Sequence, residues 1–431
     1  MTPPAMSTAF VGLSHLGIVS SAGWASQGNA VLAVDADRSL VDELRRGELP
    51  IHEPGLPELI ESSRGCLEFS ADLARVAACD LVVIARDVPT DARNMSDLAL
   101  VEALVDELVP HLRNGVTLAI MSQVSPGFSR AIGEHIRKVR PDLRFELYYW
   151  VETLIFGDAV RRTLHPERFI IGCHDPRVEI APALQTGLRK FGCPILPMRY
   201  ESAELAKTAI NLYLISSVTY ANTLADVCES IGADWSEVVP ALRLDRRIGP
   251  AAYLRPGLGI AGGNLERDLV TVQTLCGEHD VDATFLDALA RHNANRLQWA
   301  HRMLSRYVLD HKHDSVIGVW GLTYKKDTRS VRNSPSLRLI AEIGDGLTVR
   351  AWDPVISPGD LESAAEIVDS ARAAIDGADC LVIMNDWDEF AAANIDMLRD
   401  CLRQPIVVDC AGVLEGRRDE LAGFTYVAMG R

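Results

Sequence analysis

Residues 9–35 read AFVGLSHLGIVSSAGWASQGNAVLAVD. In this stretch a short apolar run meets a turn of small residues, a helical pattern follows to about residue 27, and a second apolar run ends at Asp35. This order is typical of a β-α-β unit. Apolar runs at 81–85, 116–121 and 168–172 continue the pattern. Strands that alternate with helices predict a parallel, doubly wound sheet and place the chain in the α/β class.

The middle of the chain has a different periodicity. From 201 to about 231 the apolar residues follow a 3.6-residue period without a proline or glycine, which predicts one helix. At 1.5 Å per residue this helix is about 45 Å long, a length typical of helices that bridge domains or subunits. A glycine-rich loop follows at 257–263, and the alternation of strands and helices restarts near 315.

The length of 431 residues exceeds what one hydrophobic core usually serves. We predict an α/β domain over residues 1–198, a central helical domain over 199–305, and a second α/β domain over 306–431. The strands expected in the last domain lie at 316–320, 347–352, 380–384 and 406–409.

Charge and cysteine content exclude several classes of partner. The 43 basic and 59 acidic residues give a net charge of −16, which argues against nucleic acid and anionic membrane surfaces. No stretch approaches the roughly 20 apolar residues that span a bilayer, and the amino terminus lacks a signal-peptide pattern, so we expect a cytoplasmic protein. The nine cysteines have no metal-ligand spacing, and we expect neither a metal site nor a disulfide framework.

The turn Gly12-Leu-Ser14-His-Leu-Gly17 matches the dinucleotide fingerprint GxGxxG except for Ser14 at its second glycine. In that fingerprint the amino end of the following helix binds the pyrophosphate. Asp35 closes the second strand, where a carboxylate can accept from ribose hydroxyls and repel a 2′-phosphate. The turn therefore favours NAD over NADP, although its spacing alone leaves an ordinary strand-turn-helix equally open.

Longer segments carry a resemblance to a known family. They occur in one order along the chain: GELPIHEPGL (47–56), DRRIG (245–249), the loop 257–268, GLTYKKDT (321–328), VRNSP (331–335) and WDP (352–354). Together they resemble the UDP-glucose/GDP-mannose dehydrogenase family over nearly the whole chain. The resemblance implies two Rossmann-like domains, one for NAD and one for a nucleotide sugar, joined by a helical dimerisation region. It also implies NAD-dependent oxidation at the C6 hydroxyl of a sugar nucleotide, usually in two hydride transfers through a cysteine thioester to a uronic acid.

The resemblance assigns a catalytic set. Lys207 and Asn211 match the lysine and asparagine that contact the reacting oxygen, and their four-residue spacing puts them on one helix face. Glu152 and Asp268 match two acids of the family. Alcohol oxidation needs such groups, because one must accept the hydroxyl proton and others must hold the developing oxyanion.

The same resemblance implies the binding residues. Those for the cofactor are Gly12, Ser14, Gly17, Asp35, Pro89, Ser122 and Arg332. Those for the diphosphate sugar are Arg247, Tyr253, Gly257, Gly259 and Lys325. Arg247 would reach the sugar nucleotide of the neighbouring subunit in a homodimer, and arginine forks suit diphosphate oxygens.

Four departures from the family change the expected chemistry. Where the family reads GGSCFPKD this chain reads AGGNLERD, so Asn264 replaces the nucleophilic cysteine, and an amide nitrogen cannot form a thioester. The nearest cysteine, Cys276, lies twelve residues downstream in a predicted helix. Gln123 and Phe156 replace a threonine and a second acid, and Ala411 replaces a basic residue of the family's Asp-Gly-Arg turn, so the nucleotide base stays open.

These departures lead to the hypothesis of a two-electron oxidoreductase that interconverts an alcohol and a carbonyl of a sugar nucleotide. Two alternatives stay open at this point. The chain could be a non-catalytic paralogue that binds NAD and a nucleotide sugar, or a four-electron 6-dehydrogenase that uses another nucleophile to form a uronic acid.

Overall fold

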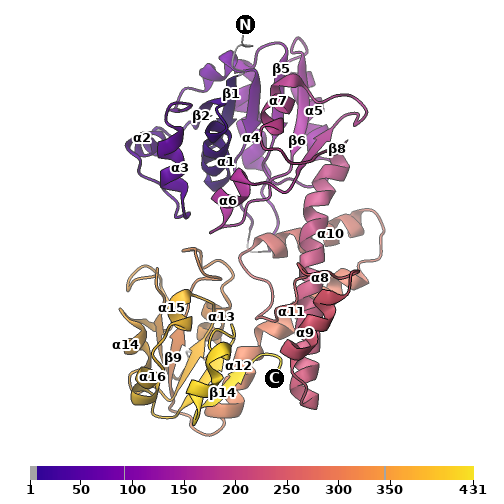
Figure 1. Ribbon diagram of the computed structural model, residues 1–431. Coiled ribbons are helices and arrows are strands. Elements are labelled where there is room, and N and C mark those ends of the chain that lie inside the picture. Colours follow the sequence, from indigo (N-terminus) through magenta and orange to yellow (C-terminus); the bar gives the residue numbers. More distant parts are fainter. Residues whose placement is uncertain (1–6, 92, 344–345) are drawn as a thin grey trace. The chain divides into compact units, whose positions relative to one another are not determined.

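The computed structural model describes residues 7–91, 93–343 and 346–431. The chain divides between Ile210 and Asn211 into two compact units, an amino-terminal and a carboxy-terminal one. Figure 1 shows the elements of both units. The predicted division into three domains stays a prediction. No helix formed by these residues is long and apolar enough to cross a bilayer.

The amino-terminal unit is built on an eight-stranded sheet in the order β3-β2-β1-β4-β5-β6-β7-β8. Its strands are β1 Ser7–Val11, β2 Ala30–Val34, β3 Leu67–Ser70, β4 Leu81–Ile84, β5 Val116–Ile120, β6 Phe145–Trp150, β7 Phe169–Cys173 and β8 Ile195–Arg199. Neighbours pair in parallel except β6 and β7, which are antiparallel. The predicted doubly wound α/β fold is confirmed.

The antiparallel pair has a consequence for the site. Because β7 returns beside β6, the connection 151–168 begins and ends at one edge of the sheet, the edge where β1, β4 and β5 also end. Residues that follow β6 therefore lie on the side on which open α/β sheets bind their ligands. The sequence pattern predicted neither β6 nor this change of direction.

Helices cover both faces of this sheet. One core contains residues of α1 (His15–Ser26), α3 (Leu56–Ser63), α6 (Ala159–Leu164) and α7 (Pro182–Arg189). The other contains residues of α4 (Ala99–Leu108), α5 (Phe128–Val139) and the first turn of α8. Successive strand residues alternate between the two cores, which explains the nearly continuous apolar runs. The helix α2 (Arg38–Arg46) and the short turns η1 (Leu73–Ala78) and η2 (Val109–His111) complete the unit.

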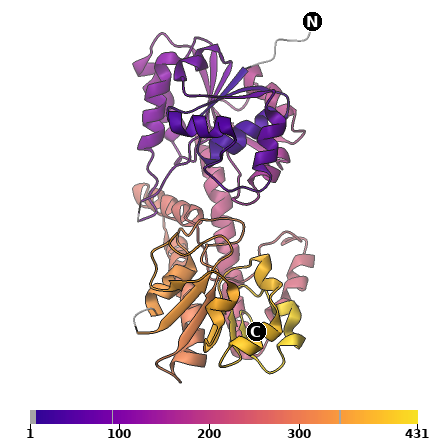
Figure 2. The same cartoon turned by 90° about the vertical axis from the view of Figure 1, so that its left-hand side faces the viewer.

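The carboxy-terminal unit contains a parallel six-stranded sheet in the order β11-β10-β9-β12-β13-β14. Figure 2 shows this sheet, in orange and yellow, from a second direction. Its strands are β9 Val316–Trp320, β10 Thr348–Trp352, β11 Glu366–Ile367, β12 Cys380–Ile383, β13 Ile406–Asp409 and β14 Thr425–Ala428. One core contains residues of α12 (Trp299–Leu304) and α13 (Pro335–Ile343), and the other contains residues of α14 (Ala371–Ile375), α15 (Asp388–Ala391) and α16 (Ile395–Cys401). The turns η3 (Ser305–Leu309) and η4 (Glu415–Leu421) lie outside the sheet.

The predicted long helix is α8, which runs over Tyr200–Ile231. Its part in the carboxy-terminal unit packs with α9 (Trp235–Leu244), α10 (Asn264–Glu278) and α11 (Thr284–Leu297) in two small cores. Leu254 and Ile260 enter these cores, so the glycine-rich loop between them is seated on α8.

A buried carboxylate fixes the start of α8 in the amino-terminal unit. Glu204 accepts from the N–H groups of Gly127 at 2.6 Å and Ser129 at 2.8 Å, at the amino end of α5. Burial raises the pKa of Glu204 despite these donors. Tyr200 donates its hydroxyl to the Leu147 carbonyl at 2.7 Å. Together these contacts hold the turn that carries Lys207.

Candidate functional site

The turn after β1 has the geometry that the fingerprint requires. Gly12 has a φ of 93°, which favours glycine. A Cβ on Gly17 would lie 1.9 Å from the Gly12 carbonyl oxygen, so α1 starts against the turn without room for a side chain. The first and third glycines of the motif therefore have the tight approach of strand and helix that a dinucleotide site needs.

Ser14 is accommodated by the neighbouring strand. It is the N-cap residue of α1, yet its side chain makes no capping hydrogen bond. Its Oγ instead donates to the Ala85 carbonyl at 3.4 Å and accepts from the Asp87 N–H at 2.8 Å. The hydroxyl that replaces the second glycine is therefore bonded to the end of β4.

Asp35 lies where the sequence placed it, after β2. Its carboxylate accepts from Leu13 N–H at 2.7 Å and from Asp37 N–H at 3.0 Å. A carboxylate offers about four lone-pair positions, so these two bonds leave acceptors for ribose hydroxyls. Asp35 thus shapes the turn and still fits its predicted contact with the cofactor.

Two further predicted cofactor residues follow β4 and β5. Ser122 is buried, and its Oγ accepts from Arg86 N–H at 3.1 Å, whereas Pro89 is exposed and its carbonyl accepts from Asp97 N–H at 2.9 Å. The sheet order changes direction between β1 and β4, and the crevice of a doubly wound sheet opens at this switch point. The turn, Asp35 and these two segments fit a bound dinucleotide.

Lys207 and Glu152 form an ion pair in the amino-terminal unit. The Lys207 Nζ lies 2.7 Å from Glu152 Oε1, and only 12% and 14% of the two side chains are exposed. Glu152 Oε2 also accepts from Leu154 N–H at 2.9 Å. The pair lies at the start of the connection that follows β6, at the ligand edge of the sheet.

Phe156, in the same connection, packs on the cofactor helix. Its ring lies 4.3 Å from the ring of His15, the first residue of α1. His15 Nε2 contacts Glu53 Oε2 at 3.0 Å, and the buried Glu53 also accepts from Gly157 and Ala159 N–H groups. Burial opposes ionisation of Glu53, but the bonds from His15, Gly157 and Ala159 outweigh it and lower the pKa of this carboxyl.

Asn211 and Asp268 form the corresponding pair in the carboxy-terminal unit. Asn211 Nδ2 donates to Asp268 Oδ2 at 2.5 Å, and Asp268 is buried beside Arg267, whose Nε lies 3.3 Å from Oδ1. Each of the four residues predicted to be catalytic is therefore paired with another of the four.

Asn264 is the exposed first residue of α10. A Cβ on the preceding Gly263 would lie 2.6 Å from Arg332 Nε, so the predicted cofactor residue Arg332 packs beside the start of α10. Cys276 lies on the same helix, and twelve residues of helix correspond to about 18 Å.

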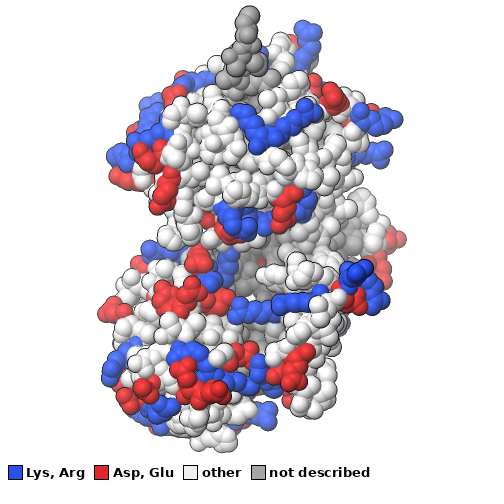
Figure 3. Space-filling view, viewed as in Figure 1, with Lys and Arg blue, Asp and Glu red and all other residues white. Residues whose placement is uncertain are grey.

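A cavity of about 400 Å³ lies in the carboxy-terminal unit, beside the glycine-rich loop. Four of the five predicted substrate residues line it: Tyr253, Gly257, Gly259 and Lys325. Arg243 and Arg255 add positive charge, and Arg255 Nη1 lies 3.1 Å from Asp386, the acid on the wall. On the face drawn in Figure 3, basic and acidic side chains are interspersed. The cation-rich wall of the cavity is therefore a local feature of a chain whose net charge is −16.

Cys410 also lines the cavity. It is buried, and burial raises the pKa of its thiol well above the usual value, so Cys410 is not a thiolate nucleophile. Within the described ranges, no group of three or more His, Cys, Asp or Glu side chains is arranged to hold a metal ion.

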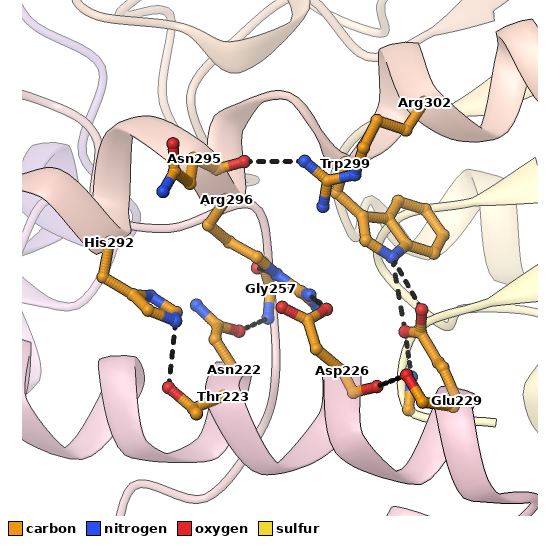
Figure 4. A network of polar contacts seen from close by, with 12 residues as sticks. Asn222, Thr223, Asp226, Glu229, Gly257, His292, Asn295, Arg296, Trp299 and Arg302 are labelled. Atoms are coloured by element: carbon orange, nitrogen blue, oxygen red, sulfur yellow. Dashed lines mark hydrogen bonds and ion pairs between the residues drawn. The ribbon is translucent and has the colours of Figure 1, made fainter.

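A network of polar contacts holds the glycine-rich loop against the neighbouring helices (Figure 4). Gly257 donates its N–H to Asn222 Oδ1 at 2.8 Å, and its carbonyl accepts from Arg296 Nε at 2.8 Å. The buried Arg296 also pairs with Asp226, and Ile260 donates its N–H to Asn293 Oδ1 at 2.8 Å. None of these anchoring side chains was among the residues predicted from the sequence, because each is an ordinary helix residue without a local motif.

Arg247 is the one predicted substrate residue that does not line this cavity. It lies after α9 with 88% of its side chain exposed and pairs with Asp245 at 2.7 Å. Its contact with a neighbouring subunit stays a prediction.

Family models match three successive parts of the chain. They describe the NAD binding domain (residues 6–186), the central domain (201–295) and the UDP binding domain (318–416) of the UDP-glucose/GDP-mannose dehydrogenase family. The first match identifies NAD as the cofactor of the amino-terminal domain, and the third identifies a nucleotide-sugar domain.

Individual proteins are similar over the whole length. The chain is 30% identical to the UDP-glucose 6-dehydrogenase of Rhizobium meliloti, with 99% of this chain and 100% of the relative covered. It is 30% identical to the UDP-glucose 6-dehydrogenase of Pseudomonas aeruginosa, with 98% and 96% covered. The solved UDP-glucose dehydrogenase of Pyrobaculum islandicum superposes with a TM-score of 0.86 at 25% identity, with 99% and 98% covered.

Proposed function

The chain belongs to the UDP-glucose/GDP-mannose dehydrogenase family, and from this premise we propose that it oxidises or reduces a sugar nucleotide by two electrons. The proposed reaction interconverts an alcohol, most simply the C6 hydroxyl, and its carbonyl. It stops before an acid forms.

The two buried pairs support a role in alcohol oxidation. The Lys207 ammonium and one N–H of the Asn211 amide stabilise negative charge on the reacting oxygen. Glu152, 2.7 Å from Lys207, accepts the hydroxyl proton, and Asp268 orients Asn211 through the 2.5 Å hydrogen bond. NAD, when bound, accepts the hydride that leaves the carbon. We assign both pairs to one reaction because all four residues match the catalytic set of the family in sequence.

Asn264 is the observation that carries the two-electron assignment. It stands at the position of the family's nucleophilic cysteine, and its amide cannot add to the aldehyde to form a species that loses a second hydride. Cys276 is about 18 Å along α10 from it, and Cys410 is a buried thiol with a raised pKa. Gln123 and Phe156 stand at the positions of a threonine and a second acid of the family. Both replacements are consistent with the loss of the second oxidation step.

We propose that the cavity beside the glycine-rich loop binds the nucleotide diphosphate. Lys325, Arg243 and Arg255 offer cations to diphosphate oxygens. Arg255 Nη2 donates to the carbonyl of Ala411, so a guanidinium lies beside the residue that replaces the family's basic side chain. Identification of the product by mass decides the base and the sugar.

A homodimer is also proposed. Tyr213, Tyr220 and Val227 are exposed by 72%, 46% and 44%, and their seven-residue spacing puts them in one stripe along α8. Such a stripe of apolar residues on a helix is typical of an interface. Arg247, whose side chain is 88% exposed, would then act on the partner's substrate. Sedimentation velocity of the whole chain tests this proposal.

The test of the reaction is its stoichiometry. The chain is incubated with NAD and a panel of nucleotide-diphosphate sugars, and each product is identified by mass. One NADH per sugar with a carbonyl product is expected. A uronic acid formed with two NADH would instead support the four-electron alternative and refute the proposal.

The Lys207→Ala variant tests the assigned site. Loss of one group that stabilises the oxyanion should lower kcat by about a hundredfold or more, with little change in NAD affinity. Lys138→Ala, which removes an exposed lysine of α5, is the matched control. Undiminished turnover in Lys207→Ala would show that the site is wrong. Binding of both ligands without turnover in the unaltered chain would favour the non-catalytic paralogue.

A further inference from the structure

Asp87 lies at the amino end of the cofactor helix. This exposed residue follows β4, and its Oδ2 accepts from the N–H of Leu16, in the first turn of α1, at 3.2 Å. Its own N–H donates to Ser14 Oγ at 2.8 Å. In dinucleotide-binding folds the pyrophosphate binds at the amino end of the helix that follows the first strand. We propose that the Asp87 carboxylate occupies this place and thereby lowers the affinity of the chain for NAD.

The sequence of α1 explains why the carboxylate of Asp87, which lies outside this helix, binds at its amino end. Ser14, the N-cap residue, makes no capping hydrogen bond, and the first turn of α1 contains no acidic residue. The amino end of a helix has unsatisfied N–H groups and a partial positive charge, which favour an anion. Asp87 supplies both the missing acceptor and the missing charge.

The pyrophosphate of a dinucleotide needs the same N–H groups. In the fingerprint fold it binds at the amino end of the helix that follows the first strand. Asp87 and the pyrophosphate are both anions, so binding of NAD must displace the carboxylate or tolerate its repulsion. The contacts of Asp87 among the described residues are with the N–H of Leu16 and with Ser14 Oγ, and neither group carries a formal charge that would offset the carboxylate.

The proposal concerns the affinity for NAD and does not depend on the proposed reaction. It can be tested by titrating NAD against the unaltered chain, Asp87→Asn and Asp87→Ala, with the dissociation constant measured by calorimetry. Asn keeps an acceptor for Leu16 and removes the charge. At about 0.05 M salt, where charges are weakly screened, both variants should bind NAD about tenfold more tightly, a change of about 1.4 kcal/mol.

Asp142→Asn is the matched control. It removes one exposed negative charge of the same unit, but it precedes β6 and therefore lies at the edge of the sheet opposite to Asp87. This variant should leave the affinity for NAD unchanged. At about 0.5 M salt the gain in the two Asp87 variants should shrink, because the group is exposed.

A purely structural role for Asp87 predicts the opposite result. If the carboxylate only stabilised α1, Asp87→Ala would lower the unfolding temperature and weaken NAD binding. A lower unfolding temperature together with tighter binding supports the proposal. Unchanged or weaker affinity in both Asp87 variants, or an equal gain in Asp142→Asn, would overturn it.

Discussion

The turn after β1 and the turn after β9 are built alike. Each begins on a glycine with positive φ, 93° at Gly12 and 94° at Gly321. The residue after each glycine donates its N–H to an aspartate that closes the neighbouring strand, at 2.7 Å to Asp35 in the first and at 2.7 Å to Asp353 in the second. Two different sequences thus reach one solution for the start of a doubly wound sheet.

The turns differ in the segments that come after them. After Gly12 the helix α1 begins at His15, whereas after Gly321 an irregular loop occupies 323–334 and α13 begins only at Pro335. The first turn therefore presents a helix end to a phosphate. The second presents Tyr324 and Lys325, which line the cavity beside the glycine-rich loop. The shared turn fixes the fold, and the segment after it fixes the ligand.

We expect the largest effect on stability and NAD binding from a substitution that separates α1 from the turn at Gly12. In Gly17→Ala the new Cβ would lie 1.9 Å from the Gly12 carbonyl oxygen, so α1 must move away from β1. We expect a loss of about 3 kcal/mol in unfolding free energy and no measurable NAD binding. Thermal unfolding and calorimetric titration check both, and binding of the nucleotide sugar should persist.

Gly28→Ala is the control for this substitution. Gly28 has a φ of 70°, but a Cβ added to it would have no atom within 4 Å, so only backbone strain of about 1–2 kcal/mol is added. NAD affinity should survive in this variant. Equal loss of NAD binding in both would mean that general destabilisation, and not the turn, explains the result.

We expect a smaller effect from removing the charge of the aspartate that accepts from each turn. Asp35→Asn and Asp353→Asn replace one carboxylate oxygen by an NH2 group, which leaves a buried backbone N–H without an acceptor and costs about 1–3 kcal/mol. Asp35→Asn should weaken NAD binding about tenfold and spare the nucleotide sugar. Asp353→Asn should do the reverse. If either variant weakened both ligands equally, the assignment of one ligand to each turn would be wrong.

The smallest effect concerns the aspartates that precede β4 and β12. Asp80 accepts from Ser7 N–H at 3.2 Å, and Asp379 accepts from Val316 N–H and from Lys312 Nζ, both at 2.8 Å. Burial opposes ionisation of Asp379, but the bonds from Lys312 and Val316 outweigh it and lower its pKa. Its stabilising contribution is therefore complete above the unfolded pKa of about 3.9 and is lost as pH falls through the lower folded pKa.

Asp379→Asn should remove this pH dependence. The difference in unfolding temperature between this variant and the unaltered chain should be a few degrees at neutral pH, since about 1 kcal/mol shifts the midpoint by about 2–4 °C in domains of this size. It should narrow as the pH falls below about 4. Asp80→Asn is the parallel variant in the other unit, because it removes an acceptor of Ser7 N–H and an ion pair with Arg113. A difference that stayed constant with pH would contradict the assigned ion pair.

The elements with the strongest periodicity were predictable from the sequence. The helix predicted over 201–231 is α8, because 32 residues of helix repeat the apolar spacing many times. The reversal between β6 and β7 was not, because an antiparallel and a parallel neighbour need the same apolar residues. The direction of a strand is set by the length and path of the connection before it, and the pattern of apolar residues contains no information about that path.

The sequence named candidate site residues, but it did not predict which side chains they contact. The resemblance pointed to Lys207 and Glu152, but their ion pair depends on a sheet connection that the pattern did not predict. Asp87 had no signal of its own, because a lone acid in a loop resembles any solvated acid until the fold brings a helix end to it. Glu53 belongs to the segment 47–56 that carries the resemblance, but the sequence did not indicate its contacts with Gly157 and Ala159.

The continuity of α8 has a consequence for how the chain unfolds. The helix belongs to both compact units, and Glu204 and Tyr200 hold only its first turns. Helix formation is cooperative, and isolated segments shorter than about 12–15 residues are marginal in water. Melting of the carboxy-terminal unit should therefore fray α8 back toward Glu204. Each unit then contributes to the thermal stability of the other through one shared helix.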